Sequence, residues 1–118
     1  MKVIGFDGWT QGAHHYERLI ESFKKNDIEL NIEGNPTDKF LQVVLEARPT
    51  QCTLVPDDPN QLTSDHGWDI NKHGERLKEI VGQLKEAGIR SSVFIDPDPE
   101  QIRLALGTDT DRIELYTE

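Results

Sequence analysis

Short apolar runs alternate with segments of helical periodicity along the chain, and this alternation limits the fold more than any other feature. The runs read KVIGF, ELNIE, QCTLV, SSVFI and RIELY, and the spacing predicts helices over about residues 15–25, 37–47, 71–87 and 99–106. Strand followed by helix, repeated, is typical of a parallel sheet whose strands are joined by helices. The alternation therefore predicts a single α/β domain over residues 1–118, with five parallel strands of βα units.

The ends of the predicted helices carry recognisable capping residues. Thr37 follows a proline and precedes one helical segment, and Asp98 precedes another that begins with Pro99. Small polar side chains favour the position before a helix, and proline favours its first turn. Gly88 and Gly107 are expected where helices stop.

Two of the predicted strands separate polar from apolar side chains. Side chains alternate with a period of two, so Glu29, Asn31 and Glu33 share one face of the second strand. Glu114 and Tyr116 share one face of the last strand in the same way. Strands with helices on both faces read instead as continuous apolar runs. Helices are therefore expected on one face of the sheet, and a polar interior or a site on the other.

Two architectures fit this pattern. A flavodoxin-like, Rossmann-like sheet has the strand order 2-1-3-4-5, and its first helix crosses to the second face. The alternative is half of a (βα)8 barrel, with all helices on one side; a complete barrel typically needs ~250 residues. The flavodoxin-like order is favoured because an open half-barrel leaves its inner face wet. Phe94 and Tyr116 on the under-covered face predict self-association.

The net charge and the length of the apolar runs limit the kinds of partner that this protein can bind. The chain has 22 acidic and 13 basic residues and a net charge of -9, which repels nucleic acid and anionic membranes. No apolar run approaches the ~20 residues of a membrane span, and the first residues lack the features of a signal peptide. A cytoplasmic protein with a small-molecule partner is expected. Cys52, the single cysteine, is predicted to be a buried core thiol.

The connections from strand to helix are longer and more polar than those from helix to strand. The longest reads LVPDDPNQLTSDHGWD and covers residues 54–69. Ligands of parallel α/β folds bind at the carboxyl ends of the strands, where these connections begin. Both tryptophans, Trp9 and Trp68, are expected at this face, which is therefore the candidate site.

Residue spacing argues against a metal site. The histidines lack HxxxH or HExxH spacing, and the aspartates of the long connection lack the spacing of a calcium loop. Surface, capping and turn roles explain these residues, so no metal and no cofactor is predicted. The residues concerned are His14, His15, His66, His73, Asp57, Asp58 and Asp65.

Four separated segments, NIEGNPT, the long connection, KEAGIRSSVFIDPDPEQI and DRIELYTE, resemble the pyridoxine 5'-phosphate synthase family of vitamin B6 biosynthesis. The resemblance implies a (βα) barrel that condenses 1-deoxyxylulose 5-phosphate with 3-amino-2-oxopropyl phosphate without a metal. It implies that this chain holds the counterparts of the third to sixth barrel strands. By the same resemblance, Glu33 matches the acid/base carboxylate and Thr63 matches a residue that contacts the deoxyxylulose phosphate.

The opening residues lead to a different interpretation. Residues 1–29, with the turn GFDGWTQG, resemble the first βα unit of a Rossmann-like GT-B glycosyltransferase more than the synthase. Other catalytic groups of the synthase family have no matching position. The favoured hypothesis is a chimera, engineered or recombined, with a join near residues 28–31, that serves as a non-catalytic scaffold with Glu33 and Thr63 as relics. The alternative is a synthase-like enzyme or phosphosugar-binding domain completed by a second chain.

Overall fold

Five parallel strands lie side by side in the order in which they occur along the chain. The computed structural model describes residues 2–5, 13–56 and 66–116. The elements are β1 (Lys2–Gly5), α1 (Ala13–Lys25), β2 (Leu30–Gly34), α2 (Asp38–Ala47), β3 (Gln51–Leu54), α3 (Ile70–Glu86), β4 (Arg90–Ile95), α4 (Pro99–Leu106) and β5 (Arg112–Leu115). The sheet order is β1-β2-β3-β4-β5, and every neighbouring pair is parallel. The predicted parallel sheet of βα units is confirmed.

The favoured flavodoxin-like order is wrong. In that order β1 would lie between β2 and β3, whereas β2 pairs directly with β3, and β1 stands at the edge of the sheet. The physical reason lies in the strands themselves. A helix on the second face would have to pack on Asn31 and Glu33, which offer it no apolar surface. The strand order is the one expected for the half-barrel alternative.

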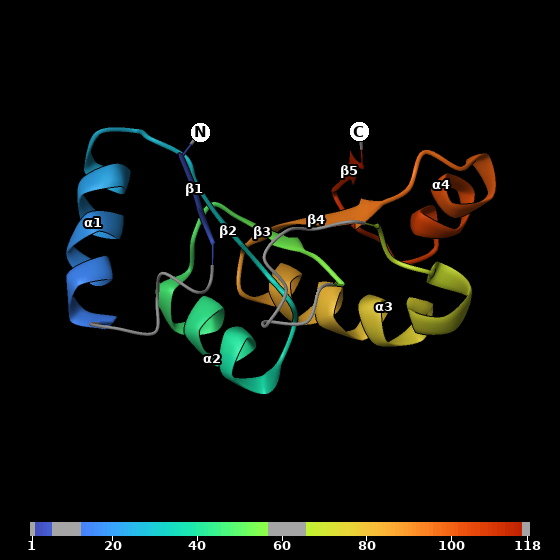
Figure 1. Ribbon diagram of the computed structural model, residues 1–118. Helices are drawn as coiled ribbons and strands as arrows, with labels where there is room; N and C mark the ends of the chain where they lie inside the picture. Colours follow the sequence, from blue (N-terminus) through green and yellow to red (C-terminus); the bar gives the residue numbers. More distant parts are fainter. Residues whose placement is uncertain (1, 6–12, 57–65, 117–118) are drawn as a thin grey trace.

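All four helices contribute to one apolar core on one face of the sheet. Figure 1 shows α2 and α3 together on the same side of the strands, with α1 and α4 at the two ends. The strands supply the side chains that point toward the helices, and each helix supplies at least one buried residue. These core residues include Leu30, Ile32, Cys52, Leu54, Val93 and Ile95 from the strands and Ile20, Phe40, Val44, Leu77, Val81, Leu84 and Ala105 from the helices.

The predicted helix caps are confirmed. The Thr37 hydroxyl accepts a hydrogen bond from the backbone N–H of Phe40 at 3.2 Å. The carboxylate of Asp98 accepts from the N–H of Glu100 at 3.0 Å, with Pro99 in the first turn of α4. Gly88 adopts a φ of 75° just after α3, a conformation that glycine adopts without steric cost. The helix bounds differ from the predicted ones by two residues at most.

The downstream end of the long connection is fixed across the ends of β3 and β4. The N–H of Gly67 donates to Asp96 Oδ1 at 3.0 Å, and the backbone N–H of Trp68 donates to the carbonyl of Phe94 at 2.8 Å. The indole Nε1 of Trp68 donates to the carbonyl of Leu54 at 2.9 Å. A Cβ atom at residue 67 would overlap the backbone of Ile95, so only glycine fits there. This segment is therefore a rigid anchor.

Trp68 has a structural role. Its side chain is buried at 4 % exposure and belongs to the core, whereas Trp9 lies outside the described residues. Cys52 is buried and free, as predicted. Within the part of the chain that the structure describes, no helix has the length and apolar character needed to span a membrane.

Candidate active site

The face of the sheet that points away from the helices is lined by polar side chains. The strand register places Asn31 of β2 beside Gln51 of β3, and Glu33 beside Thr53. Farther along the sheet, β5 brings Glu114 beside Phe94 of β4. We call this surface the inner face; its residues on the described strands are Val3, Gly5, Asn31, Glu33, Gln51, Thr53, Arg90, Ser92, Phe94, Arg112 and Glu114.

Several inner-face side chains are buried although no described helix covers them. Asn31, Gln51, Thr53 and Ser92 are each no more than 4 % exposed. Buried polar groups are stable only when they are hydrogen-bonded. The hydroxyl of Thr53 donates to Asn31 Oδ1 at 2.9 Å, and the amide of Gln51 lies 3.4 Å from the same hydroxyl. Thr53 thus has one partner on the neighbouring strand, Asn31, and one on its own strand, Gln51.

Two guanidinium groups, those of Arg90 and Arg112, hold the series of hydrogen-bonded side chains from Gln51 to Thr53 to Asn31 at the amino end of the inner face. Gln51 Oε1 accepts from Arg90 Nε at 2.7 Å and from Arg112 Nη1 at 3.3 Å. Arg90 also forms an ion pair with Glu29 at 3.3 Å. Because a guanidinium can only donate, it holds the carbonyl oxygen of the Gln51 side chain toward itself.

Glu33 stands at the other end of this chain, near the carboxyl end of β2. Its side chain is half-buried, and burial is the largest cause that raises the pKa of its carboxyl above the ordinary value. The charge of Glu114 and a side-chain hydrogen bond with it raise that pKa further. The amide of Asn31, 3.5 Å from Glu33 Oε1, acts in the opposite direction. A carboxyl in this setting is suited to take up and release a proton.

Glu114 is the partner that sequence reasoning missed. The alternation of RIELY placed it on the polar face, but pairing with Glu33 depends on where β5 lies in the sheet. The negative charge of Glu114 makes ionisation of Glu33 less favourable and so contributes to the raised pKa of Glu33.

Two aromatic side chains lie near Glu114, since Phe94 is its register partner on β4 and Tyr116 follows it by two residues. Phe94 and Tyr116 pack edge to face, with their ring centroids 5.9 Å apart and the planes at 85°. Both rings are half-buried; Phe94 lies near the carboxyl end of β4, and Tyr116 directly follows β5. Self-association through this face stays a prediction. Thr63, the other predicted site residue, lies outside the described residues.

The two histidines whose side chains the structure describes, His66 and His73, do not form part of a metal-binding group. His73 packs edge-on against Trp68, with the ring centroids 5.4 Å apart, and His66 is exposed. The side chains of His14 and His15 lie outside the described part, as do Asp57, Asp58 and Asp65. Across the ranges that the structure describes, no group of three His, Cys, Asp or Glu residues is arranged to hold a metal ion.

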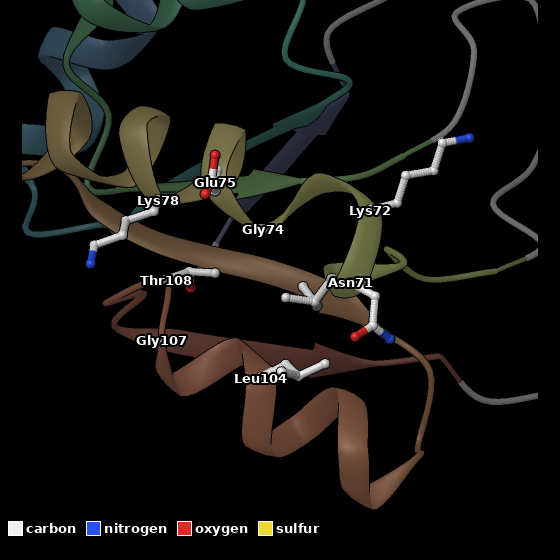
Figure 2. Close-up of a pocket in the computed structure, with 9 residues that line it drawn as sticks. Asn71, Lys72, Gly74, Glu75, Lys78, Leu104, Gly107 and Thr108 are labelled. Atoms are coloured by element: carbon white, nitrogen blue, oxygen red, sulfur yellow. The ribbon is translucent and has the colours of Figure 1, made fainter.

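A hollow with a volume of about 540 Å³ lies on the helical side, between α3 and the end of α4. Figure 2 shows Leu104 and Thr108 beside this hollow, while the chains of Lys72 and Lys78 extend in opposite directions away from it. The hollow therefore does not gather positive charge for an anion. It shares no residue with the inner face, so the candidate active site is the inner face.

Comparison with known proteins extends the resemblance over the whole chain. Residues 14–118 match the family model described as pyridoxal phosphate biosynthesis protein PdxJ. The pyridoxine 5'-phosphate synthase of Christiangramia forsetii is 53% identical, over 100% of this chain and 52% of its own length. The synthase of Bacteroides thetaiotaomicron is 44% identical, over 99% of this chain and 52% of its own. The chain thus spans about half the length of these curated relatives.

A solved structure is similar in fold alone. The apo structure of Vibrio cholerae LapD S helix-GGDEF-EAL superposes with a TM-score of 0.67 and 14% sequence identity. The similarity covers 91% of this chain and 25% of the other. At this identity the likeness supports the arrangement of strands and helices.

These comparisons overturn the favoured functional hypothesis. The interpretation as a non-catalytic scaffold is wrong, because the matching relatives are named as enzymes. The family match begins at residue 14, upstream of the predicted join near residues 28–31, and the Christiangramia forsetii synthase matches the opening residues as well. The join therefore stays a prediction without support from these matches. The chain belongs to the family of the pyridoxal phosphate biosynthesis protein PdxJ.

Proposed function

We propose that this chain carries part of the active site of a pyridoxine 5'-phosphate synthase, with Glu33 as an acid/base group. The observation that carries the proposal is the setting of Glu33, a half-buried carboxyl with a raised pKa on the polar inner face. A group that exchanges protons with a substrate works best when its pKa lies near the working pH. Burial and the charge of Glu114 both raise the pKa of Glu33 toward neutral pH.

The reaction that the family resemblance implies fits this chemistry. Joining 3-amino-2-oxopropyl phosphate to 1-deoxyxylulose 5-phosphate requires protons to leave the amine and carbon atoms and to reach departing oxygen atoms. A carboxyl that accepts a proton in one step and returns it in a later step supplies both needs. Glu33 lies next to Gly34, the last residue of β2, at the strand end where ligands of parallel α/β folds bind.

The long connection supplies the second part of the proposal. Its downstream end is fixed by Gly67 and Trp68 across the ends of β3 and β4. We propose that Thr63, within this connection, contacts the phosphate of 1-deoxyxylulose 5-phosphate. That role rests on the family resemblance.

The remaining catalytic groups are proposed to come from the rest of a barrel. The chain spans about half the length of its relatives, and β1 and β5 stand at the two edges of the sheet. Additional strands pairing with these edges would enclose the inner face, as in half of a (βα)8 barrel completed by its other half.

The test is reconstitution. The chain is mixed with the part of the Christiangramia forsetii synthase that it does not match, and formation of pyridoxine 5'-phosphate is followed from the two phosphorylated substrates. We expect activity with the wild-type chain and a loss of ~10²- to 10⁴-fold with Glu33→Gln, the range typical of a lost acid/base group.

A matched control isolates the role of the position. Glu79→Gln makes the same chemical change at an exposed position of α3 and is expected to leave the rate unchanged. Equal rates for the wild-type chain and Glu33→Gln would contradict the proposed role of Glu33. If the mixture is inactive, saturable NMR shifts on addition of 1-deoxyxylulose 5-phosphate to the chain alone still test the binding half of the proposal.

A further inference from the structure

We propose that Thr53 is a positioning residue whose hydroxyl fixes the orientation of the Asn31 side-chain amide, and thereby decides which oxygen of Glu33 is free to exchange a proton. The inference rests on the proposed function of Glu33 and deepens it. Thr53 does not itself reach the reacting atoms; it acts through Asn31.

The orientation of the hydrogen-bonded chain is set at its far end. An amide side chain can in general be turned either way, with oxygen and nitrogen exchanged. Gln51 is not free to turn, because its oxygen faces Arg90 and Arg112, at 2.7 Å and 3.3 Å, and both of these only donate. Its NH₂ group must therefore point the other way, toward the Thr53 hydroxyl at 3.4 Å.

The orientation of Gln51 determines the direction in which the Thr53 hydroxyl donates its hydrogen bond. Thr53 is fully buried, and its oxygen accepts from Gln51, which leaves its single hydrogen for Asn31 Oδ1 at 2.9 Å. Since the carbonyl oxygen of Asn31 is held toward Thr53, the NH₂ group faces Glu33 Oε1 at 3.5 Å. In the reverse orientation, the Asn31 oxygen would face the Glu33 carboxylate, an unfavourable meeting of two acceptors.

The consequence for Glu33 is an asymmetric carboxyl. Oε1 receives the N–H of Asn31, and an oxygen that accepts such a bond is the less favourable site for a proton. The other oxygen is left to exchange a proton. Among the residues that the structure describes, the titratable groups that interact with Glu33 are Glu114 from β5 and the Cys52 thiol from β3. The pKa of the Cys52 thiol is raised chiefly by its burial and also by Glu33. Arg90 and Arg112 bind the side chain of Gln51, at the opposite end of the hydrogen-bonded series.

A pair of substitutions separates the hydroxyl from the methyl group of Thr53. Thr53→Val keeps the shape and removes the hydroxyl, whereas Thr53→Ser keeps the hydroxyl and removes the methyl. The readout is the pKa of the Glu33 side chain, followed by carboxyl ¹³C NMR in the full chain without substrate. We expect an upward shift in Thr53→Val, because the Asn31 donor loses its fixed direction, and the wild-type value in Thr53→Ser.

Three outcomes would overturn the proposal. They are an unchanged Glu33 pKa in Thr53→Val, a downward shift, or the same upward shift in Thr53→Ser. If Thr53→Val does not fold, an NMR titration of the wild-type chain still tests the orientation of Asn31. The Asn31 side-chain NH₂ resonances should titrate together with the Glu33 carboxyl, and their insensitivity to that titration would contradict the orientation that we assign.

The reconstituted enzyme supplies a second readout. There, Thr53→Val should lower kcat by about 10-fold, the lower end of what the loss of an outer-shell partner costs at metal sites, with little change in KM. The pH profile of kcat should shift toward higher pH. Because the NMR measurement needs no substrate, a failure of the proposed function of Glu33 and a failure of this inference give different results.

Discussion

Both faces of the central strands bury side chains, but the two faces are held together by different forces. On β2, Leu30 and Ile32 are buried against the helices at 2 % and 0 % exposure. Between them, Asn31 is buried to the same degree at 2 % exposure, but among hydrogen-bonding partners from β3. Burial alone therefore does not distinguish the structural face of this molecule from its chemical face.

The two faces differ in whether their contacts are directional. Apolar contacts on the helical face depend on volume and shape, and they tolerate any arrangement that fills the space. Contacts on the inner face depend on which atom donates and which accepts, as in the series from Gln51 to Thr53 to Asn31. Substitutions on the first face should change stability, and substitutions on the second should change proton chemistry.

The largest expected effect is on the helical face. Phe40 of α2 has no exposed surface, and Phe40→Ala should lower the free energy of unfolding by ~3–5 kcal/mol, because it removes apolar contacts and leaves a cavity. Urea unfolding followed by circular dichroism measures the change. Leu106→Ala is the matched control, since Leu106 is 75 % exposed, and it should change stability by less than ~0.5 kcal/mol. Similar losses of unfolding free energy in Phe40→Ala and Leu106→Ala would contradict the role given to the buried helical face.

A smaller effect is expected on the inner face, and it should depend on pH. Because folding raises the pKa of Glu33, the folded state binds the proton more tightly than the unfolded state. Stability should therefore fall as the pH rises from about 4.5, the ordinary value, through the raised pKa, and change no further above it. Unfolding of the wild-type chain and Glu33→Gln at several pH values measures this difference.

Glu114→Gln sharpens the same comparison. Removing the negative charge of Glu114 should lower the pKa of Glu33 and narrow the pH range over which stability falls. An identical pH dependence in the wild-type chain and Glu33→Gln would assign the titration to other groups. An unchanged Glu33 pKa in Glu114→Gln would contradict the coupling of the two carboxyls.

The smallest effect is expected at the solvent edge of the inner face. The hydrogen bond from Arg90 and its charge lower the pKa of Glu29, so the pair favours folding above the ordinary pKa and loses this contribution as the pH falls. The carboxylate lies in solvent, where exposed ion pairs contribute little. Glu29→Gln should leave the urea midpoint at pH 7 unchanged within error, and a loss close to that of Phe40→Ala would place this pair among the core contacts.

The polar face itself could be predicted from the sequence. Alternation in ELNIE and RIELY placed Glu33 and Glu114 on the face away from the helices, and the caps at Thr37 and Asp98 located the helix starts. These features are local, because they depend on periods of two and 3.6 residues and on side chains next to the helix ends.

The strand order and the site partners could not be predicted in the same way. Whether β1 lies outside β2 or between β2 and β3 leaves every local pattern unchanged, and the preference for a covered sheet favoured the wrong order. The contact of Thr53 with Asn31 depends on the register between two strands, which no single strand encodes. The expectation of a wet inner face was also too simple, since polar side chains on the central strands β2 to β4 are buried there, among them Asn31 and Thr53.

The consecutive strand order also has a consequence for how the molecule comes apart. Each strand pairs only with the strands before and after it in the sequence, so the sheet behaves as a row of repeated units with interfaces between nearest neighbours. Loss of a unit at either end breaks one interface, whereas loss of a middle unit breaks two. Local unfolding should therefore begin at β1 or β5 and move inward. The central strands β2 to β4, which carry Asn31, Gln51 and Thr53, should be the last to lose protection from amide hydrogen exchange.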